Sequence, residues 1–367
     1  MISLSIFSML ISCAVNNVFW NILDINLKPH QNVEAIVNIG DAIILGGSIY
    51  TSGFADVKTA KPFLKLSFDQ GRNWVEKYEI DFSEVKDMQY SDSVLFITAS
   101  KYTSESNLTL GSRIIYYKYD LSGNRIEEIK LPAGKDGGLV TIVDKNTFIF
   151  KEDKGYNHHT YLKTADGGKK WEELNLSFLF TRDVFNDICV QGNQIWGVRT
   201  HIKHSKNTKD KDFQSLVSID IRTWQFIDEI RLGETSLDNK GHTLNTYAIS
   251  DIQSDGETLY LLGKNELKNT GYVWSMTGKD RKIKVLCSFE LTKNEIPQKL
   301  FIYKNKILLT YIDISTHLPI QTLLYKDLGH DTWERELFPD LTYPFLSFSN
   351  GVLMGIAEGN KIFYREF

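Results

Sequence analysis

Two aspartates, Asp69 and Asp166, stand in repeated surroundings that could support chemistry. They lie in the octapeptides SFDQGRNW (67–74) and TADGGKKW (164–171). In both, a hydroxyl residue precedes the aspartate by two positions, and a glycine and a tryptophan follow it at two and five. Carboxylates at fixed positions can act as acids, bases or metal ligands. They can also hold a tight turn, because a short aspartate side chain accepts backbone N–H bonds. We expect the structural role for the whole set, which is Ser67, Asp69, Gly71, Trp74, Thr164, Asp166, Gly168 and Trp171.

Four histidines are the next candidates for chemistry. His158 and His159 are adjacent, and His201 and His204 are three residues apart, on segments predicted to be loops. A protein metal site usually takes three or four ligands, and no cysteine or carboxylate is spaced to complete one here. No nucleophile–base pair is evident from spacing either. We therefore predict no metal, no cofactor and no catalytic residue.

The bulk composition is that of an ordinary globular protein with many strands. The 367 residues are 42% apolar, 24% charged and 12% aromatic, with a net charge of −4. A nucleic-acid binder would show a basic excess, so that class is not expected. Aromatic residues are frequent and the chain has only 7 prolines, which suits pleated sheets.

An internal repeat accounts for most of the chain. Each unit contains a short apolar strand, a polar turn, a very apolar strand, a variable loop, a third strand with a tight turn, and a fourth strand. The period is about 50 residues, and no segment favours a helix. Four strands per unit at this period indicate a β-propeller blade. Six units begin near Val33, Val85, Gly138, Val184, Tyr247 and Lys299.

The two ends of the chain supply a further blade. The C-terminal segment FLSFSNGVLMGIAEGNKIFYREF contains three strands, and an unpaired strand is expected within residues 18–27. An open ring would expose two sheet edges, so these strands should combine. The prediction is an all-β, seven-bladed β-propeller of four-stranded antiparallel blades, closed by the N-terminal strand. Six blades is the alternative count.

The two octapeptides resemble the Asp-box, or BNR repeat, of sialidase-like propellers. That family's pattern is Ser/Thr-x-Asp-x-Gly-x-x-Trp, on the hairpin between the third and fourth strands. The resemblance implies a turn on the face opposite the substrate pocket. Sialidases also hold a substrate carboxylate with three arginines, the first in an Arg-Ile-Pro context. Here the first strand reads EAIVNIGD, and no arginine precedes Arg72. The resemblance therefore covers the scaffold and not the catalytic set.

The first thirteen residues are apolar and end in Leu10-Ile11-Ser12-Cys13. This segment resembles a bacterial lipobox, in which the cysteine is lipidated and becomes the new N-terminus. We expect residues 1–13 to be a lipoprotein signal and residues 14–367 to form a single propeller domain. The expected location is the periplasm, with a lipid anchor in the outer membrane. The alternative is a buried first strand with a chance cysteine. Cys189 and Cys287 are expected to be buried free thiols.

Long, varied loops suit the binding of a partner; they connect the second and third strands of a unit, or the fourth strand of one unit and the first strand of the next. The segment NLSFLFTRD carries Phe178, Phe180 and Arg182, and aromatic residues with arginine are typical of interface hot spots. The alternative is that these phenylalanines pack beneath a neighbouring blade. Tyrosines on comparable loops are expected to line the same face; they are Tyr102, Tyr156 and Tyr343.

The sequence favours a non-enzymatic protein-binding propeller. One form of this function is an immunity protein that neutralises a secreted toxin. Lipidated propellers with similar repeats also include photosystem assembly factors. The alternative is a carbohydrate-active propeller, either a glycoside hydrolase or a lectin. The membrane is expected to be contacted only through the lipid anchor.

Overall fold

The computed structural model describes most of the chain from residue 20 onward. The described residues are 20–23, 25, 27–28, 30–50, 60–77, 82–103, 111–132, 139–153, 159–174, 176, 184–201, 213–231, 236–237, 243–244, 247–265, 267–277, 281–315, 320–338, 345–357 and 361–367.

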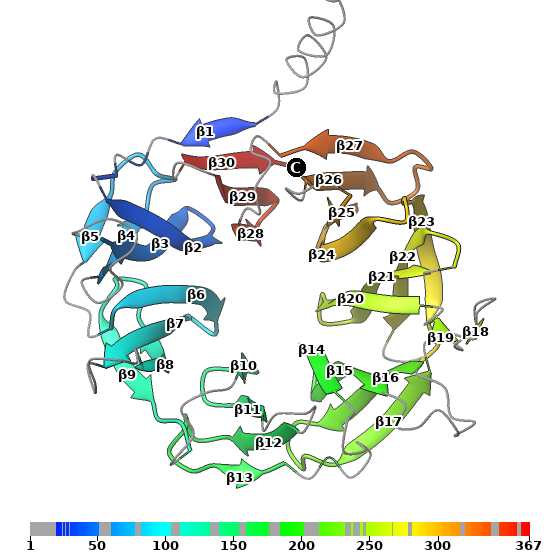
Figure 1. Ribbon diagram of the computed structural model, residues 1–367, viewed down its shortest axis with the longest axis horizontal. Coiled ribbons are helices and arrows are strands. Elements are labelled where there is room, and N and C mark those ends of the chain that lie inside the picture. The colour runs from blue at the N-terminus through cyan, green and yellow to red at the C-terminus, as the bar shows by residue number, and fades with distance from the viewer. Residues whose placement is uncertain are drawn as a thin grey trace, which may run out of the picture. The chain divides into compact units, whose positions relative to one another are not determined.

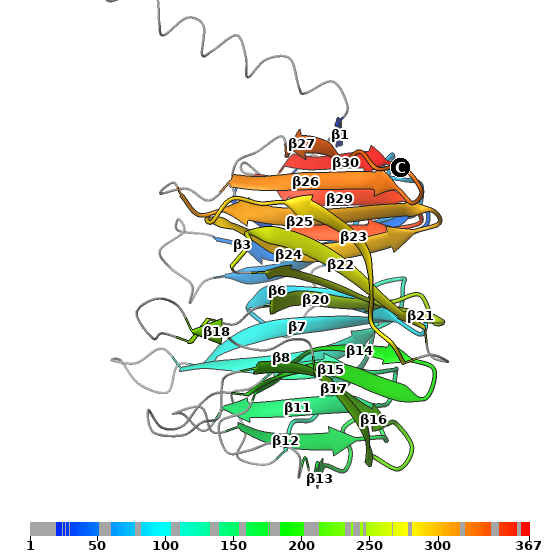
Figure 2. The ribbon, with the colours of Figure 1, turned by 90° about the vertical axis from the view of Figure 1, so that its right-hand side faces the viewer.

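Seven four-stranded antiparallel sheets and one two-stranded ribbon contain all the strands of the described residues (Figures 1 and 2). The fold is an all-β, seven-bladed β-propeller, which confirms the predicted class and the count of seven rather than six. The described residues contain no helix, and so none that could cross a membrane.

The chain divides into two compact units. The first comprises Met1–Glu128, Leu318–Leu323 and Glu334–Phe367, and the second comprises Ile129–His317 and Leu324–Trp333. The sheets of the first unit are formed by β2 (Gln31–Ile39), β3 (Ala42–Ile49), β4 (Lys61–Ser67) and β5 (Val75–Lys77); by β6 (Glu84–Ser91), β7 (Val94–Thr103), β8 (Gly111–Tyr119) and β9 (Arg125–Ile129); and by β1 (Asn21–Leu23), β28 (Phe345–Ser349), β29 (Val352–Ala357) and β30 (Lys361–Glu366).

The second unit contains three complete sheets. They are formed by β10 (Leu139–Ile142), β11 (Phe148–Asp153), β12 (His159–Thr164) and β13 (Glu172–Glu173); by β14 (Val184–Gln191), β15 (Gln194–His201), β16 (Phe213–Asp220) and β17 (Phe226–Arg231); and by β20 (Tyr247–Ser254), β21 (Thr258–Asn265), β22 (Thr270–Thr277) and β23 (Lys284–Glu290). The ribbon is β18 (Ser236–Leu237) with β19 (Thr243–Leu244). A further four-stranded sheet is formed by β24 (Glu295–Tyr303), β25 (Lys306–Asp313), β26 (Ile320–Asp327) and β27 (Glu334–Leu337).

The N-terminal strand completes the last blade, as predicted. β1 pairs antiparallel with β30, with Ile22 opposite Phe363, and the sheet order is β1-β30-β29-β28 (Figure 1). The paired segment is three residues long, shorter than the predicted span of residues 18–27. Trp20 lies just before it and packs edge-on against Phe363 at 5.0 Å between ring centroids. The closing strand is therefore held by packing as well as by its few ladder bonds.

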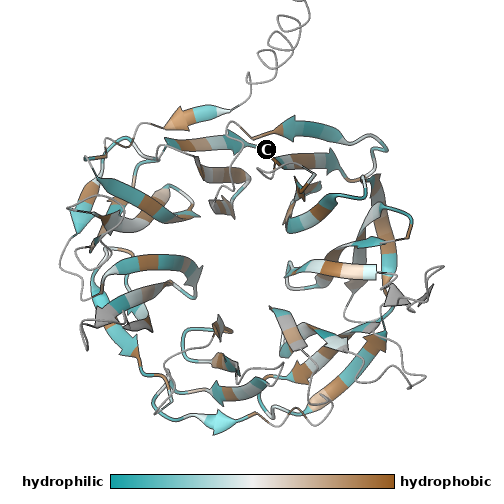
Figure 3. Ribbon diagram, in the orientation of Figure 1, coloured by the Kyte–Doolittle hydropathy of each residue, from teal (hydrophilic) through white to brown (hydrophobic). Residues whose placement is uncertain are grey.

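The second strand of each blade explains where the core lies. β3 is buried along almost its whole length, and so are β21 and β25, because both faces of these strands are covered by other strands. Such strands read as nearly continuous apolar runs, which is why they were visible in the sequence. The outermost strands are more exposed: β17 is exposed at both ends and half-buried between them, and it contains both brown and teal segments (Figure 3).

Bulges interrupt five of the innermost strands at equivalent places. A register shift occurs between Val33 and Ala35 in β2, and corresponding shifts occur in β6, β14, β20 and β24. A bulge leaves one residue without a cross-strand partner and redirects its side chain. In β2 this residue is Glu34, and in β14 the irregular stretch contains Asp187, whose φ is +48°.

Candidate functional site

Asp69 closes the turn that follows β4. Its Oδ1 accepts the Asn73 backbone N–H at 2.8 Å and the Ser67 hydroxyl at 2.8 Å. The Ser67 oxygen in turn accepts the Gly71 N–H at 2.8 Å. Bonds from the Asn73 backbone and side chain favour the ionised carboxylate, so they hold the pKa of Asp69 below its usual range. These bonds all stay inside the turn.

Asp166 repeats this arrangement after β12. Its Oδ1 accepts the Lys170 backbone N–H at 3.0 Å and the Thr164 hydroxyl at 2.8 Å. Gly168 donates its N–H to the Thr164 oxygen at 3.1 Å. The bond from the Lys170 backbone, together with that from Thr164, lowers the pKa of Asp166. The sequence match between the two octapeptides thus corresponds to one shared hydrogen-bond pattern.

The glycines and tryptophans of these turns contact the preceding blade. Gly71 has φ of +85°, and a Cβ there would lie 2.6 Å from Leu23 of β1. Gly168 has φ of +91°, and its Cβ would lie 2.9 Å from Ile129 of β9. The Trp171 indole donates to the Lys130 carbonyl at 2.7 Å. These contacts support a role for both turns as links between consecutive blades, and not as sites of chemistry.

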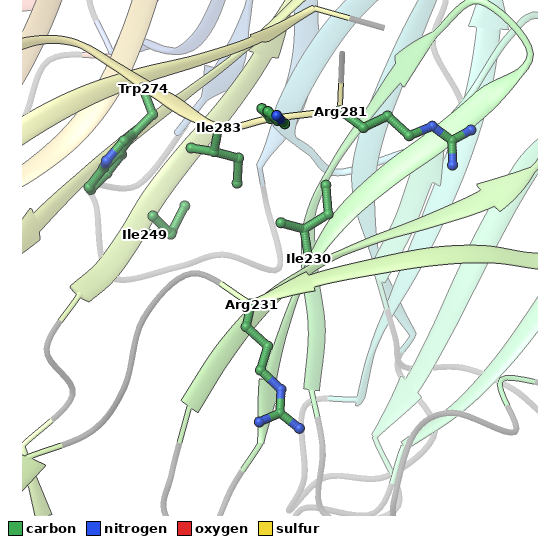
Figure 4. A pocket seen from close by; sticks show the side chains of 7 residues that line it. Ile230, Arg231, Ile249, Trp274, Arg281 and Ile283 are labelled. Atoms are coloured by element: carbon green, nitrogen blue, oxygen red, sulfur yellow. The ribbon is translucent and has the colours of Figure 1, made fainter. Parts of the chain in front are cut away.

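A pocket of about 440 Å³ lies between β17 and the blade formed by β20–β23 (Figure 4). Its floor is apolar and its remaining side chains are cationic. Ile230 and Ile283 face one another across the space, while the guanidinium groups of Arg231 and Arg281 point outward (Figure 4). The residues that line it are Ile230, Arg231, Ile249, Trp274, Arg281, Lys282 and Ile283.

Aromatic packing fixes one wall of this pocket. The Trp274 ring stacks on Tyr272 at 5.3 Å between centroids, and Tyr247 meets it edge-on at 5.5 Å. Trp274 is 8% exposed, so the ring belongs to the core behind the pocket and presents only an edge to it. Ile230 and Ile283 pack against the same core. The apolar floor is therefore part of the core and is preformed.

Three cationic side chains line the pocket, in a chain whose net charge is −4. Arg281 Nη1 lies 3.3 Å from Asp228 Oδ2, so this guanidinium is paired with a carboxylate. Positive groups around an apolar depression favour an occupant with an apolar body and a negative charge beside it.

A second pocket of about 210 Å³ lies next to the bulge of β14. Asp187 and Lys151 line it together with apolar residues that include Phe185 and Ile188. Burial raises the pKa of Asp187, and the nearby Asp251 carboxylate raises it further, although residue 187 as a whole stays exposed and solvent weakens both effects. The polar groups of this pocket have both signs, so it lacks the uniform charge of the first.

Most of the predicted partner-binding residues lie outside the described part of the chain. These are Phe178, Phe180, Arg182, Tyr156 and Tyr343, and the predicted lipidation residue Cys13 lies outside it as well. Tyr102 was expected on a loop, but its backbone belongs to β7, opposite Ser112 of β8. The β7–β8 ladder extends further than the sequence pattern indicated, so this expectation was wrong.

The histidine and cysteine predictions have separate outcomes. His159 begins β12 and His201 ends β15, so these two are strand residues and not loop residues. In the described residues, no three side chains of His, Cys, Asp or Glu are grouped to hold a metal. Cys189 and Cys287 are free thiols, as predicted, but they are half-buried and not fully buried. This partial burial raises their pKa values to about 12 and about 11.

The sequence analysis missed the cationic pocket. Two signals were present: the alternating aromatic residues of YVWSM, which contains Trp274, and the basic run KDRKIK, which begins at Lys279. Neither signal indicates that Ile230 and Arg231, about 50 residues earlier, complete the site.

Comparisons with solved structures find other proteins of the same fold. The chain is similar to a prolyl endopeptidase (TM-score 0.53, 7% identity), covering 91% of this chain and 48% of the endopeptidase. It therefore spans about half the length of that protein. It is similar to YCF48 bound to a D1 peptide (TM-score 0.50, 11% identity), covering 94% of this chain and 97% of YCF48.

A sialidase from Trypanosoma rangeli is also similar, with a TM-score of 0.41 and 10% identity, over 82% of this chain and 54% of the sialidase. No known protein family matches the chain by sequence, and no curated protein sequence does either. At these identities, the likeness to the prolyl endopeptidase and to YCF48 shows the fold alone.

Proposed function

We propose that this chain is a non-enzymatic, protein-binding β-propeller whose partner inserts an apolar side chain, flanked by a carboxylate, into the pocket between β17 and β20–β23. The observation that carries the proposal is the lining itself, in which an apolar floor is combined with three cations. We propose further that the SFDQGRNW and TADGGKKW turns are Asp-box repeats, which leaves both aspartates to hold the scaffold.

The chemistry of the lining favours binding over reaction. The seven described lining residues are isoleucine, tryptophan, arginine and lysine. At neutral pH, none of these side chains ordinarily acts as a general acid, a general base or a nucleophile. Tryptophan and arginine are also the types most enriched among residues that dominate binding energy. The same features suit an acidic protein segment better than a neutral sugar.

Exposed apolar residues also occur on the two flanking strands. Phe226 of β17 is 45% exposed and Val285 of β23 is 59% exposed. Both strands are the outermost of their blades, so a partner could cover these side chains while it fills the pocket. An interface that combines a central pocket with surrounding apolar contacts is the usual arrangement in protein complexes.

The test uses labelled peptides of matched length in which an apolar residue is followed by glutamate, lysine or glutamine. We expect the glutamate peptides to bind best, with an affinity that falls as salt rises. The double variant Arg231→Glu/Lys282→Glu should weaken this binding at least about tenfold, or about 1.4 kcal/mol. The matched control is Lys268→Glu/Lys293→Glu, which makes the same charge change at exposed residues of the same unit.

Two results would contradict this proposal. If the double variant and its control bind the glutamate peptides equally, the pocket is not the site. If wild-type protein binds none of the peptides but retains glycans on an array, the carbohydrate-active function replaces the protein-binding one.

The cellular setting is a proposal from the sequence. Lipidation at Cys13 would place the propeller at the outer membrane, facing the periplasm, where a secreted toxin is one suitable partner for an immunity protein. Mass spectrometry of protein from the native host should show a lipidated Cys13 as the first residue. An intact Met1 would contradict it, and Cys13→Ser should release the protein from the membrane fraction.

A further inference from the structure

Glu34, Tyr50 and Glu84 form a hydrogen-bonded cluster in the first unit, separate from the pockets described above. The Tyr50 hydroxyl lies 3.2 Å from Glu34 Oε1 and 3.0 Å from Glu84 Oε1. Tyr50 is 7% exposed and Glu84 is 2% exposed, while Glu34 is half-buried. Because Tyr50 follows β3 and Glu84 begins β6, this hydroxyl joins the first blade to the second.

The number of hydrogens available determines the protonation of the cluster. A phenol hydroxyl has one hydrogen and can donate it to one carboxylate only. The second contact is a hydrogen bond only if the other carboxyl carries a proton and donates it to the phenol oxygen. Tyr50 itself stays protonated, because burial and the charge of Glu34 raise its pKa. Both contacts are full hydrogen bonds when one of the two glutamates is neutral.

The surrounding groups decide which glutamate holds the proton. Glu84 Oε2 lies 2.5 Å from Lys86 Nζ and also accepts the Ser100 hydroxyl at 3.2 Å, so its ionised form is favoured. Glu34 Oε2 accepts the Ser48 hydroxyl at 3.1 Å. Burial raises the pKa of Glu34, and the charge of Glu84 adds to this effect, while Lys86 and the bonds from Ser48 and Tyr50 oppose it.

We propose that Glu34 and Glu84 share one proton across Tyr50, with Glu34 as its carrier, and that loss of this proton loosens the junction between the first two blades as the pH rises. Once both glutamates are ionised, the Tyr50 hydroxyl satisfies only one of them, and the two like charges repel. Glu34 sits at the bulge of β2, without a cross-strand partner, so it can move away while the ladder stays intact.

The sign of the effect follows from linkage. The pKa of Glu34 is raised in the folded protein above its ordinary value of 4.5. Stability from the shared proton is therefore complete below pH 4.5 and is lost as the pH rises through the folded pKa. Glu34→Gln removes this loss, because an amide can donate to Tyr50 and accept from Ser48 at any pH.

The first experiment is urea unfolding of wild-type and Glu34→Gln protein from about pH 4 to about pH 9. The wild-type folding equilibrium constant, divided by that of Glu34→Gln, should fall by up to about tenfold per pH unit and then become constant. Glu290→Gln, at an exposed position, serves as the matched control and should follow the wild type. Parallel wild-type and Glu34→Gln curves would overturn the proposal. The proposal would also be overturned if the stability of Glu84→Gln stayed constant over the pH range in which the stability of Glu34→Gln fell.

The second experiment does not depend on a variant that folds. Infrared spectra of wild-type protein with labelled glutamate should show a buried protonated carboxyl whose band disappears as the pH rises. Hydrogen exchange at the Ser83 amide, which precedes Glu84 and donates to the Ser100 carbonyl within the second blade at 2.8 Å, should accelerate over the same pH range beyond the intrinsic rate. The absence of a titrating carboxyl band, or exchange that follows the intrinsic rate alone, would overturn the proposal.

Discussion

Gly71→Ala tests how the closing strand is held against the first blade. The new Cβ would lie 2.6 Å from Leu23, which belongs to the three-residue strand β1. The backbone φ of +85° adds strain of about 1–2 kcal/mol for any residue with a Cβ. Overpacking against Leu23 adds about 1–3 kcal/mol. We therefore expect a loss of about 2–5 kcal/mol in the free energy of unfolding.

A glycine with the same backbone strain separates the two effects. Gly329 has φ of +95°, but its Cβ would meet no atom within 4 Å. Gly329→Ala should therefore lose only the strain, about 1–2 kcal/mol in urea unfolding. In the Leu23→Ala background, Gly71→Ala should lose no more than Gly329→Ala does, because the clashing side chain is gone. Equal losses for Gly71→Ala and Gly329→Ala in the wild-type background would refute this account of the contact.

Three further predictions concern the turns and the partner. Trp171→Phe should lower the free energy of unfolding by about 1 kcal/mol in urea titrations, since it removes the indole bond to the Lys130 carbonyl; an unchanged value would contradict that. Asp69→Ala and Asp166→Ala should lower the melting temperature and leave partner affinity unchanged in pull-downs, whereas lost affinity at unchanged stability would assign these aspartates to function. Phe178→Ser/Phe180→Ser/Arg182→Glu should weaken partner binding by about 2 kcal/mol in titrations if the partner extends from the pocket to this segment; equal affinity would limit the interface to the pocket.

The strands were predictable because their signals are local. The apolar run AIILGGSI and its repeats mark buried second strands, and they also set the blade count. The closing strand followed from the three strands at the C-terminus, although its short pairing depends on packing around Trp20 that no local pattern shows. The turn at Trp224 could not be predicted from a glycine signal. The turn IDIRTW has no glycine, and Trp224 itself adopts a positive φ of +60°.

The candidate sites were harder to predict because they combine distant residues. Ile230 meets Ile283 only after two blades have packed, and the partner of Glu34 across Tyr50 lies fifty residues along the chain. A carboxyl or an isoleucine has no periodic pattern that would indicate such a contact. Sequence patterns therefore predicted the scaffold, while the pocket and the shared proton emerge from tertiary structure.

The most direct test of protein binding is site-specific photo-crosslinking in the native host. A photoreactive residue replaces Ile283 inside the pocket, and in a second protein it replaces Lys268, an exposed residue of the same unit. The proposal predicts one stoichiometric protein adduct at position 283 and none at position 268, with the crosslinked peptide containing an apolar residue beside an acidic one. Adducts of equal yield at both positions, or no protein adduct at position 283 while the propeller retains glycans, would contradict it.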